Sequence, residues 1–139
     1  MKALADLKDM TEAQVKDHLC INYQRQEFYD NDGYGKKDPE IASVLKKMKV
    51  VFAYESVGSW GCDSSSWFLL KEKGSGKLFE VHGSHCSCYG FEGQFTPEET
   101  TIEALQHRAK DGWIFYCGGY DDDADLNKKS VTSFILKLK

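Results

Sequence analysis

The sequence lacks the features of a membrane or secreted protein. No apolar run is long enough to cross a bilayer, and the first ten residues, MKALADLKDM, lack the apolar stretch of a signal peptide. Proline is scarce, with two residues, while hydrophobic residues make up 41% of the chain and aromatic residues 13%. This composition argues against disorder and predicts a globular protein. We expect it to be soluble and cytoplasmic, with no membrane association.

The chain also lacks an excess of positive charge. It has 22 acidic against 18 basic residues, a formal net charge of −4. Direct nucleic-acid binding leaves a basic footprint, so this balance counts against it. An acidic surface would suit a basic protein partner, although mild acidity is also common among cytosolic proteins.

The five cysteines do not indicate a disulfide framework. Their number is odd and no secretion signal accompanies them, which favours reduced thiols, metal ligands or buried packing. At 139 residues the chain is long enough to form one domain, residues 1–139, with a core of its own. A metal ion would therefore add to an existing fold.

Two histidines and two cysteines are concentrated in the stretch KLFEVHGSHCSCYGFEGQFTPEETT, residues 77–101. Side chains at positions i and i+2 of an extended backbone point the same way, so Cys86 and Cys88 can face one point while His85 or His82 approaches from beside them. Thiolates and imidazoles that converge in this way suit zinc. We predict a structural zinc site here.

Cys62 is the first candidate for the fourth ligand, because a cysteine in an exposed polar loop is a liability unless it is used. Residues 67–72 and 77–82 flank the turn KGSG and predict a β-hairpin. The segment with Cys62 precedes the first strand and the segment with Cys86 follows the second, so both lie at one end of the hairpin. His82, His107 and Cys117 remain alternatives to Cys62.

The string GSHCSCYGFEGQF followed by TPEETT, residues 83–101, resembles a motif of small bacteriophage and prophage proteins in which GSHCSCYG, an acidic residue and PEETT follow one another. The resemblance covers these 19 of the 139 residues. It implies a phage-associated origin and a location in the host cell, but no agreed activity. Some phage proteins of this size and acidity are anti-CRISPR inhibitors, which makes a CRISPR-associated nuclease a candidate partner.

An enzymatic function is the alternative. Cys86 and Cys88 could form a redox pair, or His85 or His82 could activate Cys86 as a nucleophile. A catalytic zinc would need an open coordination position and a general base, and the sequence contains no HExxH or PCxxC pattern. A non-enzymatic protein that binds and inhibits a host defence protein therefore fits the sequence better.

The periodicity predicts an α+β fold with an antiparallel sheet of about five strands and about three helices. Helices are expected at residues 12–28, after a capping box at Thr11 and Gln14, at 39–48, capped by Asp38, and after Thr96, which with Glu99 forms a second capping box. Strands are expected at residues 50–54, in the hairpin, at 113–117 and at 131–138, and a polar, flexible connection at 56–66.

Four aspartates, Asp121, Asp122, Asp123 and Asp125, form the strongest charge cluster. They do not match a calcium loop, because Leu126 occupies the glycine position. A solvated acidic patch is one interpretation. The other is a phosphate-like surface that occupies a basic groove of a nuclease.

Overall fold

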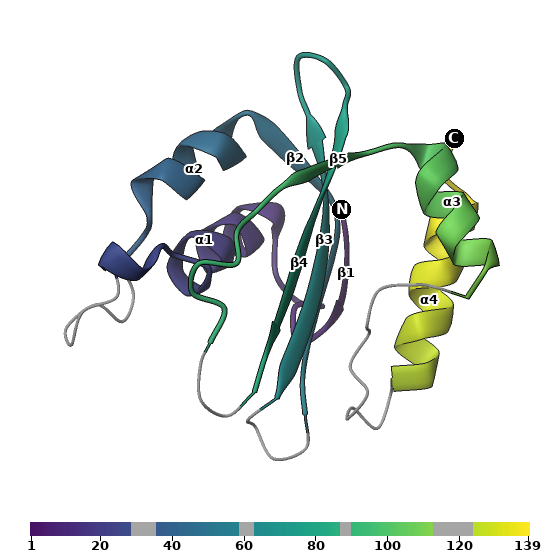
Figure 1. The fold of residues 1–139 in the computed structure, drawn as a ribbon, viewed down its shortest axis with the longest axis horizontal. Helices are drawn as coiled ribbons and strands as arrows, with labels where there is room; N and C mark the ends of the chain where they lie inside the picture. The colour runs from purple at the N-terminus through teal and green to yellow at the C-terminus, as the bar shows by residue number, and fades with distance from the viewer. Residues whose placement is uncertain (29–35, 59–62, 87–89, 113–123) are drawn as a thin grey trace.

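The computed structural model describes residues 1–28, 36–58, 63–86, 90–112 and 124–139. Within these residues the chain forms a five-stranded sheet and four α-helices (Figure 1). In chain order the elements are β1 (Lys2–Ala5), α1 (Glu12–Asn22), a 3₁₀ helix η1 (Gln26–Phe28), α2 (Pro39–Lys46), β2 (Met48–Val57), β3 (Ser64–Glu72), β4 (Leu78–His85), β5 (Glu98–Thr100), α3 (Ile102–Lys110) and α4 (Ala124–Leu136).

The strands lie side by side in sequence order, β1-β2-β3-β4-β5. Strands β2 to β5 are antiparallel to their neighbours, whereas β1 runs parallel to β2, with Lys2 opposite Phe52. The predicted α+β class is confirmed, but the sheet is mixed rather than antiparallel. The chain returns through α1 and α2 before it enters β2, and this crossover makes a parallel pair possible.

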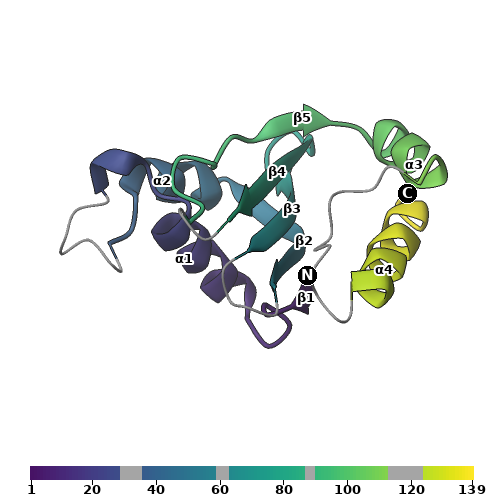
Figure 2. The same ribbon diagram turned by 60° about the horizontal axis from the view of Figure 1, so that its bottom comes forward.

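Helices cover both faces of the sheet. Figures 1 and 2 show α1 and α2 on one side and α3 and α4 on the other. Each helix pair encloses its own hydrophobic cluster. The cluster under α1 and α2 is centred on Leu19, Tyr23, Leu45 and Phe68, and the cluster under α3 and α4 on Phe52, Trp67, Leu105 and Ile135.

The central strand β3 is buried on both faces. Its seven residues from Ser64 to Leu70 are all buried, which explains why WFLL, residues 67–70, shows no alternation of apolar and polar residues. Ser64, Ser65 and Ser66 belong to this strand and Ser56 to β2, so the prediction of a polar, flexible connection over 56–66 was wrong at both of its ends. Each serine lies in a strand where its backbone groups are paired.

The predicted starts of the first two helices are confirmed. Thr11 and Gln14 form the capping box of α1, and the Asp38 carboxylate accepts hydrogen bonds from the backbone N–H groups of Glu40 and Ile41 at the start of α2. The first helix ends earlier than predicted, at Asn22 rather than near Phe28. The separate 3₁₀ turn η1 follows it.

The predicted capping box at Thr96 and Glu99 was wrong. Residues Glu98–Thr100 form β5 on the edge of β4, and Thr101 is the residue that caps α3 by accepting from the N–H of Ala104. The extended backbone of residues 98–100 pairs with β4, which satisfies its hydrogen-bonding groups. The helix therefore starts five residues later than the motif indicated.

The predicted final strand at 131–138 was also wrong, because residues 131–136 form the end of α4 and residues 137–138 follow it without forming a strand. Phe134, Leu136 and Leu138 alternate like a strand, but Val131 and Ile135 are the residues that are fully buried, and their spacing is helical. Leu136 is 44% exposed. The predicted strand at 113–117 lies outside the described residues.

Candidate metal centre at the end of the β3–β4 hairpin

The β3–β4 hairpin has the topology from which the sequence predicted a zinc site at its end. Strands β3 and β4 pair from Lys71 opposite Leu78 to Ser64 opposite His85. The chain therefore enters β3 and leaves β4 at the same end of the sheet. Cys86 follows the last paired residue directly and is exposed. Two of the four predicted ligands, Cys62 and Cys88, lie outside the described residues.

His85 has a hydrogen bond that suits a metal ligand. Its Nδ1 lies 2.9 Å from the backbone carbonyl oxygen of Cys86. A carbonyl oxygen only accepts, so Nδ1 carries the proton, and in a neutral imidazole the lone pair then lies on Nε2. Metal-binding histidines commonly donate their second ring N–H to a carbonyl in this way.

The side chain of Gln94 closes the segment that follows β4. Its Oε1 accepts from the backbone N–H of Ser84 at 2.8 Å, and its Nε2 donates to the carbonyl oxygens of Ser84 at 2.8 Å and Gly90 at 3.2 Å. The Gln94 amide therefore binds the backbone N–H and carbonyl of Ser84 in β4 and the backbone carbonyl of Gly90. Gln94 thereby joins Ser84 in β4 to Gly90.

Gly83 allows aromatic rings to pack directly against β4. A Cβ atom at this position would lie 2.5 Å from the Ser66 Oγ, 2.8 Å from a ring atom of Phe91 and 2.9 Å from a ring atom of Tyr23. The rings of Tyr23 and Phe91 stack with centroids 4.5 Å apart, and the His85 ring meets the edge of Phe91 at 4.6 Å. Only glycine leaves room for this stack.

A buried polar network lies beneath the same end of the sheet. The Tyr23 hydroxyl donates to Glu55 Oε2 at 3.1 Å and is also hydrogen-bonded to the Ser66 hydroxyl. His18 Nε2 lies 2.8 Å from the same Glu55 oxygen. Burial and the Glu55 carboxylate raise the pKa of Tyr23 well above its ordinary value, so its phenol stays protonated.

The sequence did not predict this network, because Ser66 was expected in the polar connection at 56–66 rather than in a strand. The available signal was the pairing of two small residues, Gly83 and Ser66, in neighbouring strands. Such a pair leaves room for a side chain from another element.

His82 does not belong to the same ligand set as His85. The two residues are three positions apart in β4, so their side chains leave opposite faces of the strand. His82 Nε2 lies 3.3 Å from Glu80 Oε1, and Glu80 also accepts from Trp67 Nε1 at 3.1 Å and from Arg108 Nη2 at 2.6 Å. These contacts are on the face covered by α3.

His107 is also separate from the hairpin end. It lies on α3 with a 79% exposed side chain, and its Nε2 is 3.3 Å from Asp111. The chain reaches α3 from β5, which pairs with the start of β4 and not with its end. Cys117, the remaining alternative ligand, lies outside the described residues.

Within the described residues no three His, Cys, Asp or Glu side chains are grouped so that they could hold a metal ion. His85 and Cys86 are the two predicted ligands that this part of the chain contains. Cys20 is buried in the core, where burial raises the pKa of its thiol.

The acidic cluster is described at one residue. Asp125 is exposed in the first turn of α4, where a carboxylate complements the helix dipole, and Asp121, Asp122 and Asp123 lie outside the described residues. Lys128 and Lys129 follow Asp125 on the same helix and line the same surface depression. The described part of this surface is therefore mixed in charge.

Comparisons with protein-family models, with curated proteins and with solved structures found no match for this chain. In the described part of the chain, the helices are too short or too polar for a membrane span.

Proposed function

We propose that this chain is a phage-associated, non-enzymatic zinc-binding protein that acts by binding a host defence protein. The observation that supports the zinc site best is the pairing of Ser64 with His85, because Cys62 precedes Ser64 by two residues in the sequence and Cys86 and Cys88 follow His85 by one and three residues. The Nδ1 bond of His85 adds a ring nitrogen with a free lone pair to the donor set.

A zinc ion with four protein ligands would have a structural role. It would join the segment that leads into β3 to the segment that leaves β4, and so fix the surface beside the hairpin. His85 and Cys86 belong to neither hydrophobic cluster, so the metal would order this end rather than drive folding.

Metal analysis of the purified protein tests the site. We expect about one zinc per chain by elemental analysis, lost in Cys86→Ser and in His85→Gln. His82→Gln is the matched control, because this histidine leaves the opposite face of β4, and its zinc content should equal that of the native protein. Zinc at trace level in the native protein, or retained in Cys86→Ser and His85→Gln, would refute the site.

The proposed partner is a basic nucleic-acid enzyme of the host, such as a CRISPR-associated nuclease. The resemblance of residues 83–101 to phage proteins and the net charge of −4 support this partner. A DNA-cleavage assay with a type II nuclease, titrated with the purified protein, should show concentration-dependent inhibition. Unchanged cleavage, together with recovery of no defence or nucleic-acid enzyme from host lysate, would remove the proposal.

The enzymatic alternative draws on one observation, the exposed thiol of Cys86 beside His85. It predicts turnover of a hydrolase or disulfide substrate that is lost in Cys86→Ala and in His85→Ala. The described hydrogen bond of His85 is directed at the Cys86 carbonyl, not at the thiol, so a catalytic pair would require the imidazole to turn.

A further inference from the structure

A small pocket lies on the α1–α2 side of the molecule, where α2 faces the segment between Gly93 and Pro97. Its volume is about 200 Å³. Apolar side chains form much of its wall, namely Ile41, Val44, Phe95 and Pro97. Sites for small molecules usually measure about 300–1,000 Å³, so this pocket is suited to one side chain rather than to a whole ligand.

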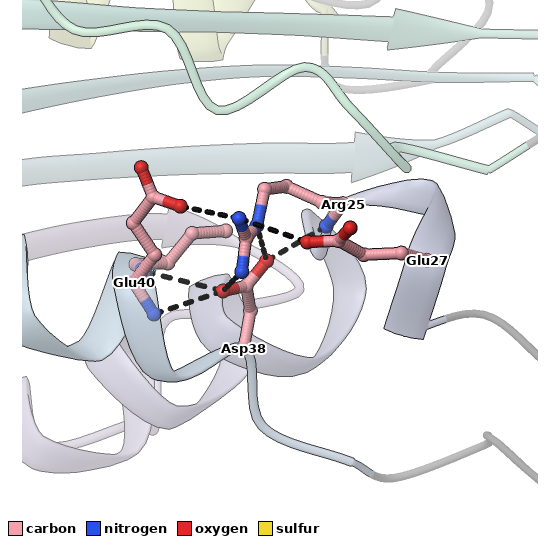
Figure 3. A network of polar contacts seen from close by, with 5 residues as sticks. Arg25, Glu27, Asp38 and Glu40 are labelled. Atoms are coloured by element: carbon pink, nitrogen blue, oxygen red, sulfur yellow. Dashed lines mark hydrogen bonds and ion pairs between the residues drawn. The ribbon is translucent and has the colours of Figure 1, made fainter.

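A cluster of one arginine and three carboxylates borders the pocket, and Figure 3 shows its members, namely Arg25, Glu27, Asp38 and Glu40. Arg25 and Glu40 are among the lining residues and form an ion pair with each other. Arg25 also pairs with Glu27 at 2.9 Å and with Asp38 at 3.0 Å. One guanidinium against three carboxylates leaves this cluster with a net charge of −2.

The two outer carboxylates remain accessible. The side chains of Glu27 and Glu40 are 63% and 65% exposed, whereas Asp38 is fully buried. Each exposed carboxylate has two oxygens with several acceptor positions, of which the ion pair with Arg25 uses a part. A cationic group that approaches the pocket therefore meets an attractive field and free acceptors.

Hydrogen bonds hold the backbone segments around the pocket in place. Asp38 caps α2 and accepts from the backbone N–H of Arg25 at 2.9 Å, and the N–H of Gly93 donates to the Gln24 carbonyl at 2.9 Å. Ile41 is buried in the core under α2, and Phe95 packs against that core. A site that exists before binding loses little conformational entropy when it is filled.

From this geometry we infer that the pocket is the docking site for one apolar side chain of a partner protein, presented by a segment with lysine or arginine on both sides of it. The inference deepens the proposed function and rests on it, since it assigns the surface by which the protein would bind a basic partner. An apolar anchor in a pocket surrounded by complementary charge is a common arrangement at the centre of protein interfaces.

Three fluorescein-labelled pentapeptides test the inference against the intact protein: Lys-Lys-Leu-Lys-Lys, Lys-Lys-Ser-Lys-Lys and Glu-Glu-Leu-Glu-Glu. We expect the first to bind at least tenfold more tightly than either of the others by fluorescence anisotropy, with amide NMR shifts at Ile41, Val44 and Phe95. Equal affinities, or absence of saturable binding up to millimolar concentrations, would overturn the assignment.

Two variants separate the apolar and the charged contributions. Val44→Arg places a large cation at the half-buried pocket wall and should abolish binding of the leucine peptide. The pair Glu27→Gln and Glu40→Gln should weaken it about threefold to tenfold at low salt and remove much of its salt dependence. Glu99→Gln on β5 is the control, and it should bind like the native protein. Full binding by Val44→Arg would refute the pocket as the site.

The outcomes distinguish this inference from the proposed function. Lack of zinc or of nuclease inhibition would end the proposed function while leaving a positive peptide result in place. A negative peptide result would end the surface assignment while leaving zinc content and inhibition unaffected.

Discussion

The buried carboxylate of Glu80 should make stability depend on pH in a defined way. It is 7% exposed and accepts hydrogen bonds from Trp67, His82 and Arg108. Burial alone would raise the pKa of this carboxyl, but the hydrogen bonds and charges of His82 and Arg108 outweigh it and lower the pKa from 4.5 to about 2. The replacement Glu80→Gln removes the charge and keeps an amide oxygen for Trp67.

The size of the stabilisation by Glu80 follows from the difference between its pKa in the folded and the unfolded state. A folded-state pKa of about 2 against 4.5 corresponds to about 3 kcal/mol of stabilisation at neutral pH. Because the folded-state pKa is the lower one, this stabilisation is complete above pH 4.5 and is lost as the pH falls towards 2. About three fifths of it should be gone at pH 3. The variant lacks this contribution at every pH.

Urea unfolding followed by tryptophan fluorescence measures the effect. We expect the native protein to exceed Glu80→Gln in free energy of unfolding by about 3 kcal/mol at pH 7 and by about 1 kcal/mol at pH 3. Glu99→Gln is the control, since its ion pair with Lys77 joins two side chains that are each 57% exposed and contributes about 0–1 kcal/mol. A difference between native protein and Glu80→Gln that stays constant with pH would refute the reasoning.

Three further predictions concern other parts of the structure, and thermal and urea unfolding test each of them. Gly83→Ala should destabilise by about 1–3 kcal/mol because its Cβ would collide with the Tyr23–Phe91 stack, while Gly74→Ala, with no atom within 4 Å of its Cβ, should change stability by less than about 0.5 kcal/mol; equal effects would contradict the packing role of Gly83. Asp38→Ala should cost about 2 kcal/mol or more, since it removes the cap of α2 and the acceptor for the Arg25 backbone; a loss under about 0.5 kcal/mol would show that water replaces it. Tyr23→Phe should cost about 1–3 kcal/mol by leaving buried Glu55 with one partner fewer, and unchanged stability would show that this bond is dispensable.

Local signals predicted the parts of the fold that depend on local chemistry. The capping residues Thr11 and Asp38 and the turn between β3 and β4 are determined by side chains a few positions away, and the structure confirms them. The wrong predictions concern segments whose secondary structure depends on contacts with distant parts of the chain. Thr96 could cap a helix, but its neighbours pair with β4 instead, and the period of residues 131–138 becomes clear only from which side chains the sheet buries.

The candidate metal centre could be predicted as a location but not as a coordination set. The position of Cys86 relative to β3 followed from hairpin topology. In an antiparallel hairpin, the start of the first strand and the end of the second lie at the same end. The orientation of His85 could not be predicted, since it depends on a hydrogen bond to the carbonyl of the next residue. The face of His82 followed from strand parity once the extent of β4 was known.

The amide of Gln94 has a consequence for self-association. Strand β5 pairs with β4 over Leu78, Phe79 and Glu80, and beyond it the outward backbone groups of Ser84 are bound by a side chain instead of a strand. An unpaired edge invites addition of a strand from another molecule. Gln94 therefore occupies the backbone groups of Ser84 through which a strand of another molecule could pair with this edge of β4.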